Sequence, residues 1–326
     1  VVKNHFTKEE MVLTQDYNNT LFALNTSGKT LWSTNVNGEI IGEINYIDAY
    51  KNGKYQALFN TATYLYLVDR NGENVDGFPK ELPSATKLGH SLFDYSNSRN
   101  YRICIVGEDN IIYNLDKKGK RVKGWKYSKN TNRITQNPIH FIVNGKDFIL
   151  NATKNTSSQL LSRNGASRVT FKDAHEFTNK VQVNDKGELY TTTTEGELWL
   201  ANTSGNSQLI EIDELNKNSQ ILCHKNYIYI SNNNKILILD GSYSQVNNIT
   251  LDGAIISLKG FGDKLTISTE NSLYLIEDSS ILEGFPIDTD GYFNISDIDN
   301  NGKKNLLNIK NGMLYNYELG TSPINK

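Results

Sequence analysis

The sequence predicts an all-β fold, an eight-bladed β-propeller of four-stranded antiparallel blades, with seven blades as the alternative. The main observation is a repeated phrase, an apolar run followed by a polar turn. Successive copies begin 37 to 47 residues apart, a period that suits four strands of about six residues with short turns. The eight copies begin at Leu21, Leu65, Ile112, Gln159, Leu198, Ile236, Leu273 and Leu314.

Each copy predicts the third strand of a blade, and its flanking residues predict the others. A second extended run precedes the phrase, as at 57–59 and 103–106, and predicts the second strand. Many of these runs are apolar at adjacent positions, which is typical of strands covered on both faces, here by the neighbouring blades. A glycine turn follows the phrase, as at 26–28 and 70–72, and leads into the outer strand.

Three outer strands end in a glycine followed by an aromatic residue. Proline is tolerated there because an outermost strand has an unpaired edge. We interpret these endings as edge protection and blade packing, and not as a recognition motif. They are Gly77-Phe78-Pro79, Gly124-Trp125-Lys126 and Gly284-Phe285-Pro286.

A repeat array closes into one unit, so we expect a single propeller domain over residues 1–326. The eighth copy has no clear outer strand, so either residues 1–4 pair there and close the ring or that strand lies outside this sequence. The chain begins with Val1 and not methionine, which we take to indicate a processed protein or part of a longer one. The blades fall near 1–38, 39–85, 86–130, 131–175, 176–215, 216–252, 253–290 and 291–326.

The composition argues against several classes of protein. The chain has 34 Lys and Arg and 36 Asp and Glu, spread without a basic stripe, so we expect no nucleic-acid partner and no anionic membrane surface. No apolar run reaches the eighteen or so residues that span a bilayer. Cys104 and Cys223 fall in different repeats and are expected to be two separate buried thiols.

Signatures of enzymes are thin. We find no nucleophile elbow, no metal-binding histidine pair and no phosphate-binding glycine loop. A carboxylate pair of the glycosidase type stays open, because Glu43, Asp48 and Asp94 could converge in a ring. We therefore favour a protein that is not an enzyme and assign no catalytic residue.

Several segments resemble a known group of proteins. These are 65–82 (LYLVDRNGENVDGFPKEL), 12–19, 27–32 (SGKTLW) and 297–307 (DIDNNGKKNLL). They are similar to the C-terminal propeller of envelope-anchored flavobacterial (Bacteroidetes) proteins, and more distantly to quinoprotein-like, WD40/YVTN-like and FG-GAP propellers. The resemblance covers essentially the whole chain. It implies an extracytoplasmic protein, periplasmic or associated with the outer membrane, with an anchor upstream of this sequence.

The sharpest local motif lies in the eighth blade. Oxygen donors at alternate positions, with a glycine after the third, form the loop with which proteins wrap a calcium ion. FG-GAP blades resemble this loop but have an acid at the last position, so a calcium ion here would be held weakly. The candidate ligands are Asp297, Asp299, Asn301, Lys303 through its carbonyl, and Asn305.

Other blades offer a simpler explanation of this motif. Asp48 and Asp94 open the equivalent turns of blades two and three without the other ligands. A recurring aspartate of this kind is typical of a hydrogen-bonded turn. Apart from calcium in blade eight, we expect no cofactor.

The innermost strand of each blade lines the central channel, where propeller ligands collect. Histidines concentrate on these segments, namely His90, His140 and His224, with His5 placed there too. A ligand site at the channel mouth is the interpretation that we test, against a water-filled channel with solvated polar walls. The candidate ligand-binding residues are Glu43, His90, Gln136 and Asn137.

These patterns favour a non-catalytic protein–protein interaction scaffold of the bacterial cell envelope, with protein partners there. A ring of blades is a rigid body with variable loops on two faces, and nothing in the loops concentrates catalytic groups. The rival is a carbohydrate- or peptide-binding or hydrolysing module that uses the channel mouth. Two carboxylates within about 10 Å of each other at the mouth, or a deep pocket there, would favour the rival.

Overall fold

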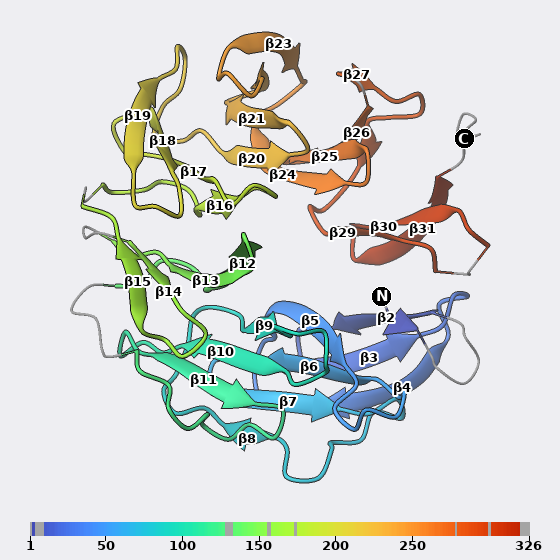
Figure 1. Cartoon of the computed structure of the whole chain (residues 1–326). Coiled ribbons are helices and arrows are strands. Elements are labelled where there is room, and N and C mark those ends of the chain that lie inside the picture. The colour runs from blue at the N-terminus through green and yellow to red at the C-terminus, as the bar shows by residue number, and fades with distance from the viewer. Residues whose placement is uncertain are drawn as a thin grey trace. The chain divides into compact units, whose positions relative to one another are not determined.

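The computed structural model describes residues 2–3, 10–127, 133–154, 158–172, 175–277, 279–298 and 301–319. These residues form β-strands and no helix (Figure 1). No helix in this part of the chain is therefore long and apolar enough to cross a membrane. The strands build eight antiparallel sheets, each from a continuous stretch of sequence.

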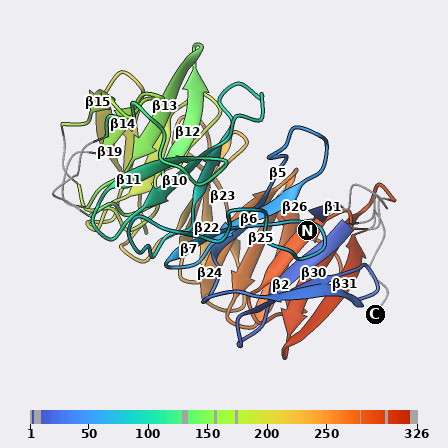
Figure 2. The same ribbon diagram turned by 90° about the horizontal axis from the view of Figure 1, so that it is seen from below.

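Except for β28 of the seventh sheet, the strands of each sheet follow one another in sequence order. The first sheet contains β1 (Val2–Lys3), β2 (Glu10–Gln15), β3 (Thr20–Leu24) and β4 (Thr30–Asn35). The second contains β5 (Ile41–Ile47), β6 (Gln56–Asn60), β7 (Tyr64–Val68) and β8 (Lys80–Glu81). The third contains β9 (Ser91–Phe93), β10 (Arg102–Val106) and β11 (Ile112–Asp116). The fourth contains β12 (Ile139–Val143), β13 (Lys146–Asn151), β14 (Gln159–Leu161) and β15 (Ser167–Thr170), which lie side by side in Figure 2.

The remaining sheets repeat this order. The fifth contains β16 (Gln182–Val183), β17 (Leu189–Thr192), β18 (Glu197–Ala201) and β19 (Ser207–Glu211). The sixth contains β20 (Ile221–His224), β21 (Tyr227–Asn232), β22 (Lys235–Leu239) and β23 (Gln245–Thr250). The seventh contains β24 (Ile255–Phe261), β25 (Lys264–Thr269), β26 (Ser272–Glu277), β27 (Ser280–Ile281) and β28 (Ile287–Asp288). The eighth contains β29 (Phe293–Ser296), β30 (Lys304–Lys310) and β31 (Met313–Leu319).

The sheets differ mainly at their outer edges. The third and eighth have three strands among the described residues, and in the seventh both β27 and β28 pair with β26. In the third sheet a single bridge between Leu115 and Arg121 stands where an outer strand was expected. Val2 and Lys3 pair with β2 in the first sheet and not with the eighth, so this segment is the inner strand of its own blade.

Burial explains why the repeated phrase is so apolar. All five residues of β6 are buried, as are four of the five in β7, β18 and β22. Outer strands such as β15 are mostly exposed. The prediction that the second and third strands are covered on both faces is therefore correct, and they form the core.

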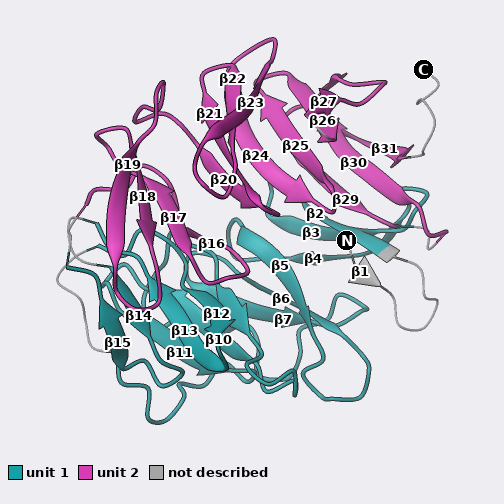
Figure 3. Ribbon diagram, turned by 45° about the horizontal axis from the view of Figure 1, so that its top comes forward, with its two compact units in different colours: residues 1–174, 298–300 teal, residues 175–297, 301–326 magenta. Residues whose placement is uncertain are grey.

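The chain divides by its internal contacts into two compact units (Figure 3). The first comprises residues 1–174 and 298–300, and the second comprises residues 175–297 and 301–326. In the first unit, consecutive sheets pack through glycines in the turn before the outer strand. A Cβ on Gly72 would lie 2.7 Å from the Trp32 ring, and one on Gly165 would lie 2.9 Å from the Trp125 ring. A tryptophan at the outer edge of one sheet thus covers the turn of the next.

Both cysteines are free thiols. Cys104, in β10, is fully buried, whereas Cys223, in β20, is only half-buried. Burial raises the pKa of each thiol to about 12. The expectation of two separate thiols holds, but Cys223 is less buried than expected.

Candidate ligand-binding site

Two glycines let neighbouring sheets of the first unit approach each other closely. Gly42 lies in β5 and Gly89 just before β9, and a Cβ on Gly89 would be 2.9 Å from the Ile41 carbonyl oxygen and 3.0 Å from the Gly42 Cα. Gly42 has φ near +79°, and the pairing of β5 with β6 shifts register after Ile41, so β5 bulges here. The next residues in sequence, Glu43 and His90, therefore border the same pocket.

This Glu43 pocket is an open hollow of about 400 Å³. It is bordered by β5, by residues 90–94 at β9 and by residues 138–140 at the start of β12. Its ionisable side chains are Glu43, His90, Asp94 and His140. Two of the four residues predicted for the ligand site, Glu43 and His90, thus meet in one pocket.

His90 is a neutral, largely buried imidazole. Its side chain packs with only 8% of the residue exposed, and burial lowers its pKa to about 4. The Nδ1 atom lies 3.2 Å from the Asn60 Oδ1. Because the amide nitrogen of Asn60 donates to the Thr61 carbonyl, Oδ1 must be the acceptor, so the proton of His90 sits on Nδ1. The Nε2 atom is then a buried acceptor with no partner among the described residues, suited to a ligand hydroxyl or amide.

His140 is held in place by a carboxylate behind it. Its Nε2 lies 2.7 Å from the Asp147 Oδ1, and the Arg163 Nε lies 2.6 Å from the other oxygen of Asp147. Burial alone would raise the pKa of Asp147, but the hydrogen bonds from Arg163 and His140 outweigh it and hold the pKa below its usual range. The edge of the Tyr95 ring also packs on His140, with centroids 4.7 Å apart. His140 is therefore a fixed wall of the pocket.

The two carboxylates at this pocket are not equivalent. Both oxygens of Asp94 accept backbone N–H groups of its own turn, from Ser98 at 3.1 Å and Arg99 at 2.7 Å. Glu43 is exposed on the bulge of β5. The pocket therefore offers an exposed carboxylate at Glu43, a half-buried one at Asp94 that is held by its own turn, and a neutral imidazole at His90. These groups suit hydrogen bonding to a polar ligand. A hydrolytic pair of the glycosidase type would need two carboxyl groups that both face the ligand.

The other predicted residues lie elsewhere. Gln136 and Asn137 precede β12 but do not border the Glu43 pocket. Gln136 is buried, and the side-chain oxygen of Asn137 is buried without a partner among the described residues. His224 lies in β20, in the second unit, and His5 lies outside the described residues.

The turn predicted to bind calcium has internal hydrogen bonds of its own. An oxygen of Asp297 accepts the Gly302 N–H at 3.1 Å, and Asn301 accepts the Lys303 N–H at 2.8 Å. The amide nitrogen of Asn301 donates to Glu318 at 2.7 Å. The turn after β5 has the same geometry, since an Asp48 oxygen accepts the N–H of Gly53, five residues further along the chain.

The last two candidate ligands of this turn are Asp299 and Asn305. Asp299 lies outside the described residues, and Asn305 is buried in β30, where it pairs with Ser296. The described residues hold no group of three or more His, Cys, Asp or Glu side chains arranged to hold a metal ion. Calcium binding at this turn stays a prediction.

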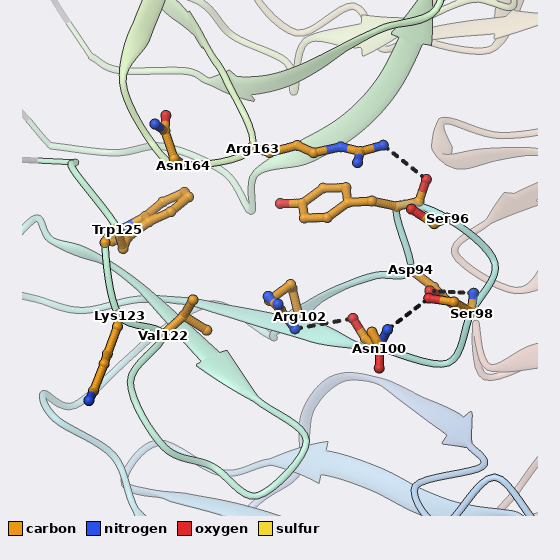
Figure 4. A pocket seen from close by; sticks show the side chains of 12 residues that line it. Asp94, Ser96, Ser98, Asn100, Arg102, Val122, Lys123, Trp125, Arg163 and Asn164 are labelled. Carbon is orange, nitrogen blue, oxygen red and sulfur yellow. Dashed lines mark hydrogen bonds between the residues drawn. The ribbon is translucent and has the colours of Figure 1, made fainter.

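A second pocket lies beside the first and was not anticipated from the sequence. This Trp125 pocket, of about 300 Å³, is surrounded by Trp125, Arg102, Lys123 and Arg163 (Figure 4). The Arg163 guanidinium sits 5.0 Å from the centre of the Tyr95 ring. The signal in the sequence was the ending Gly124-Trp125-Lys126, which we interpreted as edge protection and blade packing.

A third pocket occupies the equivalent end of the second sheet. This Tyr50 pocket, of about 320 Å³, is formed by the turn between β5 and β6 and by the turn after β7. Tyr50, Tyr55 and Arg70 border it. The two tyrosines are 59% and 41% exposed, so they present aromatic surface to solvent.

The eight successive antiparallel sheets define the class of the protein as a β-propeller, with eight blades and not the alternative seven. Solved structures of that class match almost the whole chain. BamB from Moraxella catarrhalis matches with a TM-score of 0.64 and 13% identity, over 92% of this chain and 91% of that one. Saccharomyces cerevisiae Sqt1 matches with a TM-score of 0.67 and 11% identity, over 97% and 94%.

A third similar structure is BBS1N in complex with ARL6DN, with a TM-score of 0.62 and 9% identity, over 88% of this chain and 95% of that one. At these identities the likeness establishes the fold. No protein-family model and no curated protein matches the sequence.

Proposed function

We propose that this chain is a non-catalytic protein–protein interaction scaffold. The observation that supports this is the composition of two pockets on neighbouring sheets. The Tyr50 pocket combines Tyr50 and Tyr55 with Arg70, and the Trp125 pocket combines Trp125 with Arg102. Tyrosine, tryptophan and arginine are the residue types enriched at protein interfaces and at their hot spots.

The loops that carry these residues are rigid, which favours binding. Asp48 anchors the turn after β5 through the N–H groups of Asn52 and Gly53, both at 2.9 Å. Asp94 anchors the turn after β9, which borders the Trp125 pocket, in the same way. A preformed loop loses little conformational entropy when a partner binds, so aromatic residues on such turns are efficient contacts.

We place the scaffold in the bacterial cell envelope, periplasmic or at the outer membrane. This rests on the resemblance of segments 65–82 and 297–307 to envelope-anchored Bacteroidetes propellers. The partner role is in keeping with BBS1N, a similar propeller that was solved in complex with ARL6DN.

The test is affinity capture of the full-length protein from native membranes after mild crosslinking. A Tyr50→Ser/Tyr55→Ser variant should lose a partner that the wild type retains, because each exposed tyrosine contributes aromatic contact area. Tyr17→Ser is the matched control, since Tyr17 is fully exposed on a turn between β2 and β3, away from both pockets. The proposal fails if the wild type recovers no stable partner.

A second function is favoured by one observation at the Glu43 pocket. The unpartnered Nε2 of buried His90 can accept a hydrogen bond from a polar ligand, so a carbohydrate- or peptide-binding or hydrolysing module is the alternative. Calorimetry with oligosaccharides and short peptides tests it. Binding that is lost in His90→Phe and kept in Tyr50→Ser would favour this alternative over the scaffold.

A further inference from the structure

The outer edge of the third sheet is strongly basic. Residues 117–127 contain five lysines and one arginine and no acid, although the whole chain has a net charge of −2. This stretch follows β11 and includes the bridge to Arg121 that stands in place of an outer strand. Positive charge is therefore concentrated on one edge of an otherwise slightly acidic chain.

The charges on this edge are available to a partner. Lys118, Lys120, Lys123 and Lys126 are exposed, and none forms an ion pair with a carboxylate in the described part of the chain. The nearest acid in sequence, Asp116, uses one oxygen to accept the N–H groups of Lys118 and Lys120. Its carboxylate thus holds the turn through the backbone, and the side chains of Lys118 and Lys120 are exposed.

The edge continues into the Trp125 pocket. Lys123 itself borders that pocket together with Arg102 and Arg163 (Figure 4). The backbone N–H of Lys126 donates to the Asn164 carbonyl at 2.7 Å, which ties the edge to the opposite wall. A ligand could therefore contact the exposed lysines and reach into the pocket at the same time.

We propose that this basic edge, defined as Lys118, Lys120, Lys123 and Lys126 with Arg102 in the pocket, binds an acidic segment of a protein partner. The inference rests on the proposed scaffold function and specifies the partner's chemistry. Arginine and lysine side chains here complement the carboxylates of Asp and Glu, and complementary charge steers association and sets its register.

The chemistry of the pocket favours a peptide over nucleic acid. Bases of a single strand stack on open aromatic faces, but the Trp125 ring packs against Gly165 and its Nε1 donates to the Ile112 carbonyl at 2.7 Å. The Tyr95 ring is covered by Arg163 and contacts His140. Neither ring offers a free stacking platform.

The surroundings also argue against a membrane surface. A protein that inserts into the interface presents large apolar side chains beside its basic residues. Within the described residues 94–127, no large apolar side chain is exposed. The edge is therefore polar and basic, and a peptide with several carboxylates is the occupant that it fits.

Fluorescence anisotropy with a labelled octaglutamate peptide tests the proposal, with octaglutamine as the uncharged reference. The wild type should bind octaglutamate more tightly, and affinity should fall as salt rises because exposed charges are screened. The variant Lys118→Gln/Lys120→Gln/Lys123→Gln should bind about ten-fold more weakly. Circular dichroism should give an unchanged melting temperature, because all three side chains are exposed.

The matched control is Lys29→Gln/Lys186→Gln/Lys217→Gln, which removes the same charge from exposed positions on other sheets and should change affinity by about two-fold or less. Equal losses in both variants would mean a net-charge effect and would overturn the proposal. It would equally be overturned if oligothymidylate or phosphatidylglycerol vesicles bound the edge more tightly than octaglutamate.

The edge and the scaffold function can fail separately. If a partner is captured equally by the wild type and by the edge variant, the scaffold stands and the basic edge is not its binding site. If the wild type captures no partner, the scaffold function itself is wrong.

Discussion

Replacing Asp48 by alanine should destabilise the first unit by about 2–4 kcal/mol. The Asp48 side chain is fully buried, and its two oxygens accept the N–H groups of Asn52 and Gly53, both at 2.9 Å. The second oxygen also lies 2.7 Å from the Arg99 guanidinium. Without the carboxylate, two backbone donors and a guanidinium lose their acceptor.

The magnitude follows from the three contacts. A hydrogen bond to a charged group contributes about 1.5–3 kcal/mol when its donor cannot be rehydrated. Asn52 and Gly53 are exposed, but their N–H groups donate to a carboxylate that is fully buried, so water replaces only part of each bond and we take the low end for each. The Arg99 side chain is 44% exposed, so its ion pair contributes at most about 1 kcal/mol.

The pH dependence gives a second readout. Burial alone raises the pKa of Asp48, but the N–H groups of Gly53 and Asn52 and the charge of Arg99 outweigh it, so the pKa is lower in the folded protein. The stabilisation is therefore complete above about pH 4, the unfolded value, and is lost as pH falls through the folded pKa. The difference between wild type and Asp48→Ala should shrink only below about pH 4.

Urea denaturation followed by tryptophan fluorescence measures the difference in free energy of unfolding between the wild type and Asp48→Ala. The two proteins can be compared when their m-values are equal. Asp69→Ala is the matched control, because Asp69 also accepts two backbone N–H groups, from Asn71 and Glu73. Its carboxylate is only half-buried, so water can replace both bonds, and it forms no ion pair with a described residue. The substitution should cost about 1 kcal/mol or less. If Asp48→Ala lost no more stability than Asp69→Ala, the argument from burial would be refuted.

Three further predictions concern the strand approach, the thiols and the calcium turn. Gly89→Ala should lower the free energy of unfolding by about 1–3 kcal/mol, because the new Cβ meets the Ile41 carbonyl oxygen, and thermal melting measures this loss. The same substitution should weaken any ligand binding at the Glu43 pocket, which calorimetry measures. Cys104 and Cys223 should resist Ellman's reagent at neutral pH until denaturant is added, because burial raises both pKa values to about 12; rapid labelling of the native protein would contradict this. If calcium binds the turn at Asp297, chelator should lower the wild-type melting temperature and leave Asp297→Ala unchanged, whereas equal melting with and without chelator would argue against the ion.

The repeated phrase was sufficient to predict the fold because it reports the core directly. Strands such as β7 and β22 are buried at nearly every position, so apolar residues recur in the corresponding strand of each blade. The outer edges could not be predicted equally well. An outer strand was expected between the glycine turn at 117–119 and the ending Gly124-Trp125-Lys126, but the structure has only a bridge from Leu115 to Arg121 there.

The candidate site could be predicted only in part. Glu43 and His90 were found because they occupy equivalent positions in successive repeats, and the structure brings them together at one pocket. His140 joins them there through packing between sheets, and its link through Asp147 to Arg163 joins residues from separate strands. The repeat period shows which residues are equivalent in different blades, but it does not show which side chains of different strands or sheets contact each other.

The basic edge illustrates a different limit. The run at 117–127 is visible in the sequence, but charge balance over the whole chain concealed it. Only the arrangement of Lys123 beside Arg102 and Arg163 shows that residues from two sheets contribute to one surface.

The pairing of Trp32 with Gly72 and of Trp125 with Gly165 has a consequence for biosynthesis. Each indole leaves the ribosome one repeat before the turn that covers it. A nascent chain therefore exposes a tryptophan until the next blade is complete, and a fragment cut after the first or third blade exposes it permanently. Such a fragment should aggregate more readily than one that runs on through the next glycine turn, because it exposes an indole in addition to the face of its last sheet.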